Sequence, residues 1–418
     1  MPETLSERLR ARGDLPPSYD GHGLVNLPAT VLAAFGASEG DDPPALTDLD
    51  PALIAGVRQI VVVLADGLGW WQLERFCEIG ATPFLGEIVE RARRRDAAQL
   101  LEATTVFPST TAAAITTMHT ARTPQEHGNI AYFVWLDEFK QVTAMLRWGP
   151  AVTRRGSYFD DQRNDPRKYT KVTSIHGRLR ERGVVPYVIE PEMFRNEAMT
   201  RMHAREATYV GYVLPTTMGV RLRELVTERP HGTAPSYVYA YWSGIDTSSH
   251  LYGPKSEEAA SEAASFDLNL RRAIGDRGSG DTLVIVTADH GHAFTDPDEQ
   301  IDLLGDEELR ALLRNPIAGE PRLAFLHTDH PALVRQHLEE RWPGAFQLLD
   351  RDELIEAGMF GRGDAAMARR RIGEVCAMVG GDRGARIMRV DGQDFRHRGS
   401  HGGMSPDEMR IPILAWRV

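Results

Sequence analysis

The sequence predicts an α/β fold built on a mostly parallel, doubly wound sheet. Four short apolar runs rich in Val and Ile are typical of strands buried on both faces, and they lie at residues 59–64, 184–189, 236–242 and 283–287. Helical patterns lie between them, at residues 83–94, 173–182 and 257–274. Because strands and helices alternate along the chain, we expect consecutive strands to run parallel in one sheet.

The length and composition are those of a folded, enzyme-sized protein. The chain has 418 residues, of which 42% are hydrophobic and 26% charged, and such values exclude a disordered, collagen-like or coiled-coil protein. A long loop is expected over residues 158–171. We expect an N-terminal extension, the α/β core, an inserted cap region rich in charged helices and a return to the core, at residues 1–50, 51–295, 296–396 and 397–418.

The charge balance limits the classes of partner. The chain has 48 Lys and Arg against 59 Asp and Glu, and the net charge of −11 has the wrong sign for attraction to nucleic-acid polymers or anionic membranes. A small anionic substrate would need local positive charge, which metal ions can supply. No pattern indicates an oligomeric state.

Cysteine usage and hydropathy bear on the compartment. Cys77 and Cys376 are far apart and lack a CxxC partner, so neither a disulfide framework nor a thiolate zinc site is predicted. No apolar stretch follows the charged N-terminus, and no later run reaches membrane-spanning length. We therefore expect a cytoplasmic protein, provided that the sequence begins at the native N-terminus.

Acidic residues follow three of the predicted strands. Asp66 follows the first in the segment VVVLADGLG, Asp246 follows the third, and Asp289 follows the fourth. Ligands of open α/β sheets gather outside the carboxyl ends of the strands. The three aspartates are therefore candidate metal ligands, although an aspartate at such a position can equally cap the next helix.

The segment TVFPSTTAAAITTMHT predicts a helix of small residues that begins near Thr111, after Pro108 and Ser109. A hydroxyl at a helix N-terminus meets the positive end of the helix dipole and free backbone N–H groups. Both favour a bound phosphate and a developing alkoxide. The alternative is a threonine that only caps the helix.

Three histidines accompany the aspartates. His250 lies four residues after Asp246, so on one helical turn both side chains would point to the same side. His290 belongs to the segment DHG, in which Gly291 would permit the turn that lets neighbouring residues bind one ion. His401 lies in the glycine-flanked loop GSHGG. Carboxylate and imidazole ligands suit zinc, and manganese less selectively.

Taken in order, the motifs D, FPSxT, DxxxH, DHG and GSHGG resemble the alkaline phosphatase superfamily, and within it the type I phosphodiesterase and nucleotide pyrophosphatase family. The motifs span Asp66 to His401 and cover most of the chain. The resemblance implies an α/β/α sandwich whose core binds two divalent metal ions, commonly zinc, with manganese as the alternative. It implies that one ion binds Asp66, Asp289 and His290 beside Thr111, and that the other binds Asp246, His250 and His401.

The activity that the resemblance implies is hydrolysis of a small phosphoester, most simply a phosphodiester or nucleotide pyrophosphate. It would proceed through a phosphothreonine intermediate on Thr111, with one ion holding the threonine alkoxide and the other stabilising the departing oxygen. Hydrolysis of a phosphomonoester or phosphonate is the alternative within the superfamily. A degenerate, non-catalytic binding protein is the alternative from another class, and the presence of every proposed ligand and of the nucleophile argues against it.

The sequence departs from the family pattern at the phosphate-binding asparagine. The family pattern HGxxxN ends here on Tyr132, whereas Asn129 directly follows the glycine, and we expect one of the two to donate a hydrogen bond to a phosphate oxygen. His292 is expected to hold its loop, with contact to phosphate or support of a metal ligand as alternatives. A monoesterase would add cationic side chains, for which the candidates are Arg154, Arg155, Lys168 and Lys171.

Overall fold

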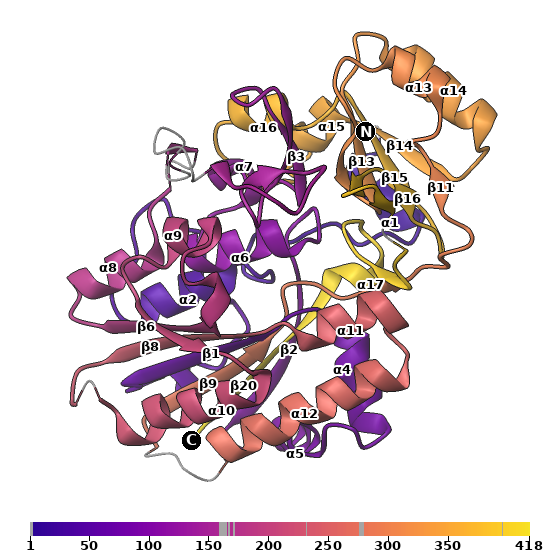
Figure 1. Ribbon diagram of the computed structural model, residues 1–418. Coiled ribbons are helices and arrows are strands. Elements are labelled where there is room, and N and C mark those ends of the chain that lie inside the picture. Colours follow the sequence, from indigo (N-terminus) through magenta and orange to yellow (C-terminus); the bar gives the residue numbers. More distant parts are fainter. Residues whose placement is uncertain are drawn as a thin grey trace.

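The structure is a computed structural model that describes residues 3–158, 165, 168–169, 172–230, 232–275, 280–394 and 396–418. The long loop predicted over residues 158–171 falls largely outside these residues. The described residues form two units with separate hydrophobic cores, a main unit below and a cap unit above it in the view of Figure 1.

The main unit is built on a seven-stranded sheet whose β20 pairs antiparallel with β2 and β9, while the other neighbours pair parallel. All residues of the central strand β1 are buried, as its Val-rich run predicts. The mostly parallel sheet of the prediction is confirmed, and the four predicted strands are present. The strand order is β2 (Ala98–Thr104), β20 (Arg410–Arg417), β9 (Thr282–Thr287), β1 (Gln59–Ala65), β8 (Ser236–Trp242), β6 (Val185–Pro191) and β7 (Thr208–Tyr212).

Helices cover both faces of this sheet, which confirms the α/β/α sandwich (Figure 1). The three predicted helices correspond to α5, α8 and α12. One face carries α2 (Asn26–Ala34), α6 (Thr111–Thr120), α8 (Ile175–Glu181) and α9 (Ala198–His203). The other carries α4 (Trp70–Glu78), α5 (Pro83–Arg93), α10 (Pro215–Arg223), α11 (Gly244–Tyr252) and α12 (Glu257–Ala273).

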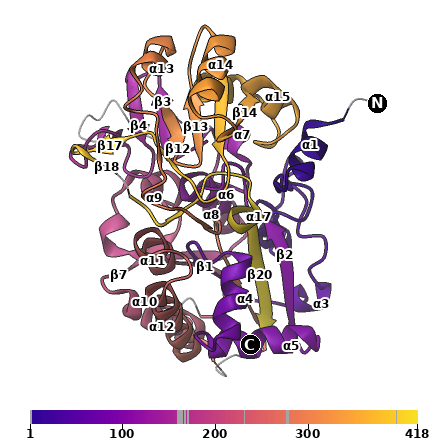
Figure 2. The ribbon, with the colours of Figure 1, turned by 90° about the vertical axis from the view of Figure 1, so that its right-hand side faces the viewer.

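The cap unit is a second, antiparallel seven-stranded sheet with helices packed around it (Figure 2). Its strand order is β14 (Phe346–Asp350), β15 (Val375–Val379), β13 (Leu323–Leu326), β12 (Ala318–Glu320), β3 (Phe133–Leu136), β4 (Gln141–Ala144) and β5 (Gly149–Pro150). Its helices are α13 (Glu307–Leu312), α14 (Pro331–Arg341), α15 (Arg351–Glu356), α16 (Ala366–Arg371) and the N-terminal α1 (Leu5–Ala11).

The cap unit is therefore larger than the insertion predicted at residues 296–396. Strands β3 to β5 come from the range expected for the core, and Leu5 and Leu9 of the expected N-terminal extension pack into the core of the cap unit. The cap sheet thus joins segments that lie far apart in the sequence.

The remaining elements are short. They are α3 (Pro51–Ile54), α7 (Pro124–His127), a 3₁₀ turn at Glu192–Phe194, a π turn at Glu224–Glu228, α17 (Pro406–Met409), and the pairs β10 (Ala293–Phe294) with β19 (Gly399–Ser400), β11 (Ile301–Asp302) with β16 (Ala385–Arg386), and β17 (Arg389–Val390) with β18 (Gln393–Asp394). No described helix combines the length and apolar character needed to cross a membrane.

A buried ion pair joins the two units. Arg322, between β12 and β13, places Nη2 3.2 Å from Glu408 Oε2 in α17, directly before β20. The Glu408 carboxylate also accepts hydrogen bonds from Gly403 N and Ser405 Oγ. Burial raises the pKa of Glu408, but Arg322 and these hydrogen bonds outweigh it and hold the pKa below its ordinary value. Glu408 therefore carries a buried, paired negative charge.

We expect Arg322→Ala to lower the free energy of unfolding by about 3–5 kcal/mol, because it leaves the buried Glu408 charge without its partner. Arg410→Ala is the matched control, since the Arg410–Glu102 pair is 44% and 47% exposed and should contribute less than about 1 kcal/mol. Urea denaturation at neutral pH measures both. The difference in unfolding free energy between wild type and Arg322→Ala should become smaller as the pH falls. A carboxyl with a lowered pKa, such as that of Glu408, loses its stabilising contribution when it is protonated in acid. If both variants lost the same small amount of unfolding free energy, the Arg322–Glu408 pair would not stabilise the fold as expected.

Candidate metal and nucleophile site

Two buried aspartates lie at the carboxyl ends of neighbouring central strands. Asp66 directly follows β1, and Asp289 lies two residues after β9, which pairs with β1 in parallel register. The backbone N–H of Gly67 donates to Asp289 Oδ1 over 3.0 Å. The turn after one strand therefore holds the carboxylate that follows the other.

His290 lies between the two carboxylates. Its Nε2 is 3.6 Å from Asp66 Oδ1 and 3.3 Å from Asp289 Oδ2. The turn expected from Gly291 does not use a left-handed conformation. Glycine is required there for a different reason, since a Cβ would lie 2.1 Å from the carbonyl oxygen of Asp407.

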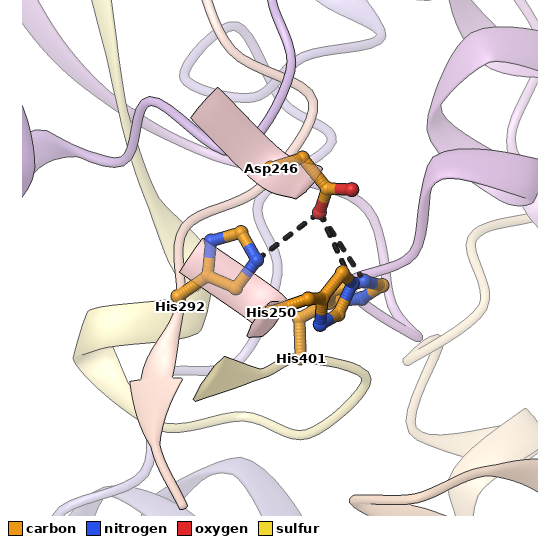
Figure 3. A group of neighbouring side chains, drawn as sticks. All are labelled: Asp246, His250, His292 and His401. Atoms are coloured by element: carbon orange, nitrogen blue, oxygen red, sulfur yellow. Dashed lines mark ion pairs between the residues drawn. The ribbon is translucent and has the colours of Figure 1, made fainter. Parts of the chain in front are cut away.

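A second group of side chains converges on Asp246. Asp246 and His250 lie one turn apart on α11, with 3.2 Å between Asp246 Oδ1 and His250 Nε2. His401 follows β19 and brings its Nε2 to 3.8 Å from the same oxygen. Figure 3 shows these two imidazoles and that of His292 turned toward Asp246. The ligand atoms of these four residues lie within 4.8 Å of one another.

The two groups adjoin. Ligand atoms of Asp66, Asp246 and His290 also lie within 4.8 Å of one another, so Asp246 stands between the groups. The structure thus brings together all six residues that the resemblance assigns to the two ions.

The chemistry of these residues fits divalent cations. Asp66 Oδ1, Asp246 Oδ1 and Asp289 Oδ2 are buried and form no hydrogen bond within the described part of the chain. A buried carboxylate oxygen without a partner is costly, and a cation removes the cost. Carboxylate oxygens and imidazole nitrogens in groups of three are the donors of catalytic zinc sites.

Backbone carbonyls orient the three expected histidine ligands. The Nδ1 atom lies 2.7 Å from Gly399 O in His250, 2.8 Å from Ser109 O in His401 and 3.1 Å from Gly291 O in His290. A hydrogen on Nδ1 would be donated to each carbonyl and would leave Nε2 as an acceptor that faces the carboxylates. This support of a histidine by its other ring nitrogen is typical of metal ligands.

The electrostatics of the cluster are unbalanced without cations. Burial raises the pKa of Asp66 well above its ordinary value, and the neighbouring Asp289 and Asp246 raise it further. The pKa of Asp246 is held well below its ordinary value, because His250 and His292 outweigh the effect of burial. The Tyr241 hydroxyl donates to Asp66 Oδ2 and offsets part of the repulsion.

Thr111 is the first residue of α6 and points into this cluster. Its Oγ1 lies 3.1 Å from His290 Nε2. Thr110 occupies the N-cap position, and no side-chain hydrogen bond caps the helix. The Thr111 hydroxyl is therefore not used as a cap. Ser109 joins the nucleophile segment to the His401 loop, because its Oγ donates to Gly403 O and accepts from Gly402 N, over 2.9 Å each.

Two cavities meet at Thr111, and Thr111, Tyr132 and Leu146 line both. The metal-side cavity has a volume of about 220 Å³ and is lined also by Thr110, Phe133, Asp246, His250, Glu320, Pro321, His397, Ser400 and His401. The apolar cavity has a volume of about 340 Å³ and is lined also by Ile115, His119, Arg147, Glu190, Met193, Phe194, Glu197, Met199, Thr200 and Tyr241.

The two candidates for phosphate binding lie in different surroundings. Tyr132 lines both cavities. Asn129 lines neither, and its side-chain amide donates to Ala112 O and Thr116 Oγ1 within α6, over 2.9 Å each. The structure therefore brings Tyr132 to the site, while the Asn129 amide hydrogens are used by the helix.

The cationic candidates also lie away from the nucleophile. Arg154 and Arg155 are exposed, and the backbone N–H of Arg154 donates to Asp391. Lys168 lines a separate cavity beside Trp135. Lys171 lies outside the described residues.

Two residues of the site, Tyr241 and Glu320, have no clear signal in the sequence. Tyr241 is the penultimate residue of β8 and reads as a strand residue. Glu320 reaches the metal-side cavity from the cap unit, accepts a hydrogen bond from Tyr132 N over 2.6 Å, and has its pKa raised to about 7 by burial. His292 was expected to hold its loop, with contact to phosphate or support of a metal ligand as alternatives, and its ring faces Asp246 (Figure 3).

Comparisons with known proteins agree with this geometry. The model of the family described as type I phosphodiesterase / nucleotide pyrophosphatase matches residues 60–404. A comparison with curated proteins found no matching sequence.

Solved structures share the fold. Murine ectonucleotide pyrophosphatase / phosphodiesterase 5 has 17% sequence identity and a TM-score of 0.61, with 85% of this chain and 87% of that chain covered. The human protein of the same name has 16% sequence identity and a TM-score of 0.62, with the same shares of both chains covered. Phosphonoacetate hydrolase from Sinorhizobium meliloti, in complex with phosphonoformate, has 19% sequence identity and a TM-score of 0.60. The match covers 87% of this chain and 91% of that chain.

We expect zinc to raise the melting temperature of protein stripped with a chelator, and Asp66→Asn to remove most of this gain. A cation that binds only the folded state adds about 2.7 kcal/mol at a hundredfold excess over its Kd. In the stripped protein, Asp66→Asn should itself be stabilising, because it removes a charge that burial, Asp289 and Asp246 oppose. Differential scanning calorimetry with and without zinc measures both effects.

Asp267→Asn is the control for this experiment. Asp267 is also a buried carboxylate, but it accepts hydrogen bonds from the backbone of α5 and lies outside the cluster. The zinc-dependent gain should stay at the wild-type value in this variant. An equal gain in wild type and Asp66→Asn would exclude Asp66 as a ligand.

Proposed function

Because the chain belongs to the type I phosphodiesterase / nucleotide pyrophosphatase family, we propose that it hydrolyses phosphodiesters or nucleotide pyrophosphates with Thr111 as nucleophile. The observation that carries the proposal is the position of the Thr111 hydroxyl. It begins a helix, lies 3.1 Å from His290 Nε2 beside the cluster of carboxylates and imidazoles, and faces two cavities.

The local structure suits Thr111 to attack phosphorus. At the N-terminus of α6 the helix dipole and the free backbone N–H groups favour an anionic phosphate next to the hydroxyl. The Thr111 Oγ1–phosphorus bond would form as the ester bond to the leaving oxygen breaks, which gives a phosphothreonine. Attack by water would then release Thr111 and the phosphate product. Among the structural neighbours, a murine phosphodiesterase 5 variant with threonine replaced by alanine is described as inactive and is in complex with AMP.

Two groups of residues would hold the divalent ions that the family implies. Asp66, Asp289 and His290 would hold the ion beside Thr111, and Asp246, His250 and His401 would hold the other. When bound, such ions supply positive charge for the threonine alkoxide, the transferring phosphoryl group and the departing oxygen. Zinc is the ion that this donor set favours, and manganese is the second choice.

Two features favour a diester over a monoester. A phosphodiester carries an organic group on each side of phosphorus, and Thr111 lies where two cavities meet. A terminal phosphate carries more charge and is commonly held by Lys or Arg. Among the described residues that line the metal-side cavity, none is Lys or Arg, and Arg147 lines the apolar cavity.

The walls of the cavities indicate how the substrate would lie. The phosphate would occupy the junction beside Thr111 and Tyr132, where Tyr132 is the candidate donor to a phosphate oxygen. The apolar cavity, with Ile115 and Phe194 among its lining residues, would take an apolar or aromatic group of the substrate.

We expect zinc-loaded protein to hydrolyse bis-p-nitrophenyl phosphate with a higher kcat/KM than p-nitrophenyl phosphate. Thr111→Ala should lower the diester rate on the order of a thousandfold or more, because it removes the covalent nucleophile. Initial rates of p-nitrophenolate release measure both.

Thr117→Ala is the matched control for this experiment. Thr117 lies on the same helix with its hydroxyl hydrogen-bonded to His127, away from both cavities, so the variant should stay close to wild type in rate. If the wild-type protein instead hydrolysed p-nitrophenyl phosphate with the higher kcat/KM, the protein would be a monoesterase and not a diesterase. An unchanged diester rate in Thr111→Ala would exclude the threonine mechanism.

A further inference from the structure

We infer that His292 is a fourth protein ligand in the group formed by Asp246, His250 and His401, and that it binds the divalent cation through Nε2. The family motif assigns three residues to this ion. His292 lies two residues beyond His290 in the segment DHGH. The inference rests on the proposed metal binding and is independent of the proposed reaction.

The first argument is an oxygen atom surrounded by nitrogens that do not satisfy it. Asp246 Oδ1 lies 3.1 Å from His292 Nε2, 3.2 Å from His250 Nε2 and 3.8 Å from His401 Nε2. Asp246 Oδ1 and His292 Nε2 are nevertheless both buried atoms without a hydrogen-bond partner within the described part of the chain. One carboxylate oxygen that faces three imidazole nitrogens in this way is the arrangement that a shared cation would satisfy.

The second argument is the orientation of the His292 ring. Its Nδ1 faces a backbone carbonyl, Gly67 O, at 3.4 Å. His250 and His401 use the same arrangement at 2.7 and 2.8 Å, so in all three residues Nε2 is the nitrogen left to face Asp246. The contact of His292 is longer, but the assignment of the two nitrogens is the same.

The third argument is that the surrounding chain makes room for the ring and fixes it. His292 is fully buried. A Cβ at residue 67 would lie 2.5 Å from His292 Cε1, so only glycine fits opposite the ring. Gly67 also has a φ of 73°, which glycine adopts without strain. The indole N–H of Trp71 donates to His292 O over 3.2 Å and holds the backbone that carries the ring.

A purely structural role for His292 explains less. A residue that only holds its loop needs the Nδ1 contact with Gly67, and any donor of similar shape would supply it. Such a role does not explain why Nε2 is buried without a partner 3.1 Å from a carboxylate oxygen. An unpaired buried polar atom destabilises the fold, and a cation on Nε2 would remove this cost.

A fourth protein ligand changes the character of this ion. Catalytic zinc commonly has three protein ligands and an open position, and it can expand to five-coordinate in the transition state. Asp246 and three imidazoles would hold the ion with four protein donors, one more than catalytic zinc commonly has. We therefore expect a tightly held ion with a preference for zinc over manganese, because three nitrogen donors suit the softer ion.

A crystal structure of the zinc-loaded wild-type protein, with anomalous data at the zinc edge, tests the inference without any variant. A distance of about 2.0–2.1 Å between zinc and His292 Nε2 is expected for a ligand. A separation in the hydrogen-bonding range of about 2.7–3.2 Å, or any longer separation, would overturn the inference.

Zinc affinity in variants gives a second, independent readout. His292→Asn keeps a side-chain donor near the position of Nδ1 and lacks Nε2. It therefore separates the role of holding the loop from the role of binding the cation. We expect it to weaken one of the two bound ions by at least the roughly 10–100-fold that loss of a supporting partner costs, as measured by competition with a chromophoric chelator. His250→Asn should weaken the same ion.

His397→Asn is the matched negative control. The His397 ring packs 4.3 Å from that of His250, but His397 is not among the four residues whose ligand atoms converge. Its zinc affinities should match those of wild type. Zinc affinities in His292→Asn equal to those of wild type would overturn the inference. Absence of diester hydrolysis by the zinc-loaded wild type would count against the proposed reaction and not against this inference. The visible absorption of Co²⁺-loaded protein should also change in His292→Asn and stay unchanged in His397→Asn, because it reports the ligand set.

Discussion

The site depends on one constraint, which is that three carboxylates lie close together out of water. Asp66, Asp246 and Asp289 each have one buried oxygen that finds no hydrogen-bond partner among the described residues. Burial and the neighbouring carboxylates Asp289 and Asp246 raise the pKa of Asp66, so the protein alone disfavours a charge on that carboxyl. Divalent cations would offset this repulsion, and the imidazoles around the same oxygens have the orientation that a ligand requires. Cation binding at this cluster would therefore be coupled to folding stability.

The fold produces this closeness from backbone geometry. Parallel strands β1, β8 and β9 end at the same edge of the sheet, so the residues that follow them must meet there. Two glycines permit the close approach. At Gly67 a Cβ would meet the His292 ring, and at Gly291 it would meet the carbonyl oxygen of Asp407. The cap unit then closes the site from above, since Phe133, Glu320 and Pro321 line the metal-side cavity and the Arg322–Glu408 pair holds the cap against the core.

Local patterns explain how much of this could be predicted. The four strands carry their signal in consecutive apolar residues, and the aspartates and histidines of the cluster belong to short motifs at strand ends. The cap sheet has no such signal, because β3 pairs with β12 across 186 residues of sequence and no local periodicity encodes that pairing.

The roles of Asn129 and Tyr132 depend on which side chain the α6–β3 connection turns inward. That choice follows from the hydrogen bonds of Asn129 to Ala112 and Thr116, which only the folded chain reveals. Tyr241 was missed for a similar reason, since a tyrosine in a strand carries no functional signal until its hydroxyl is seen to face a carboxylate.

The two groups of donors also differ in charge, and this difference bears on their separate tasks. Asp66, Asp289 and His290 supply two carboxylates, which would neutralise a divalent ion almost fully. Asp246 is the only carboxylate in its group, so an ion there would keep about one unit of positive charge whether two or three neutral imidazoles bind it. Thr111 lies beside His290 and therefore next to the group that has two carboxylates. An ion in that group would carry less net positive charge than an ion beside Asp246. Asp246, His250 and His401 line the metal-side cavity, where no described lining residue is Lys or Arg, so an ion held there would supply the positive charge of that cavity. This difference in ligands would thus compensate for the absence of Lys and Arg among the described residues that line the cavity.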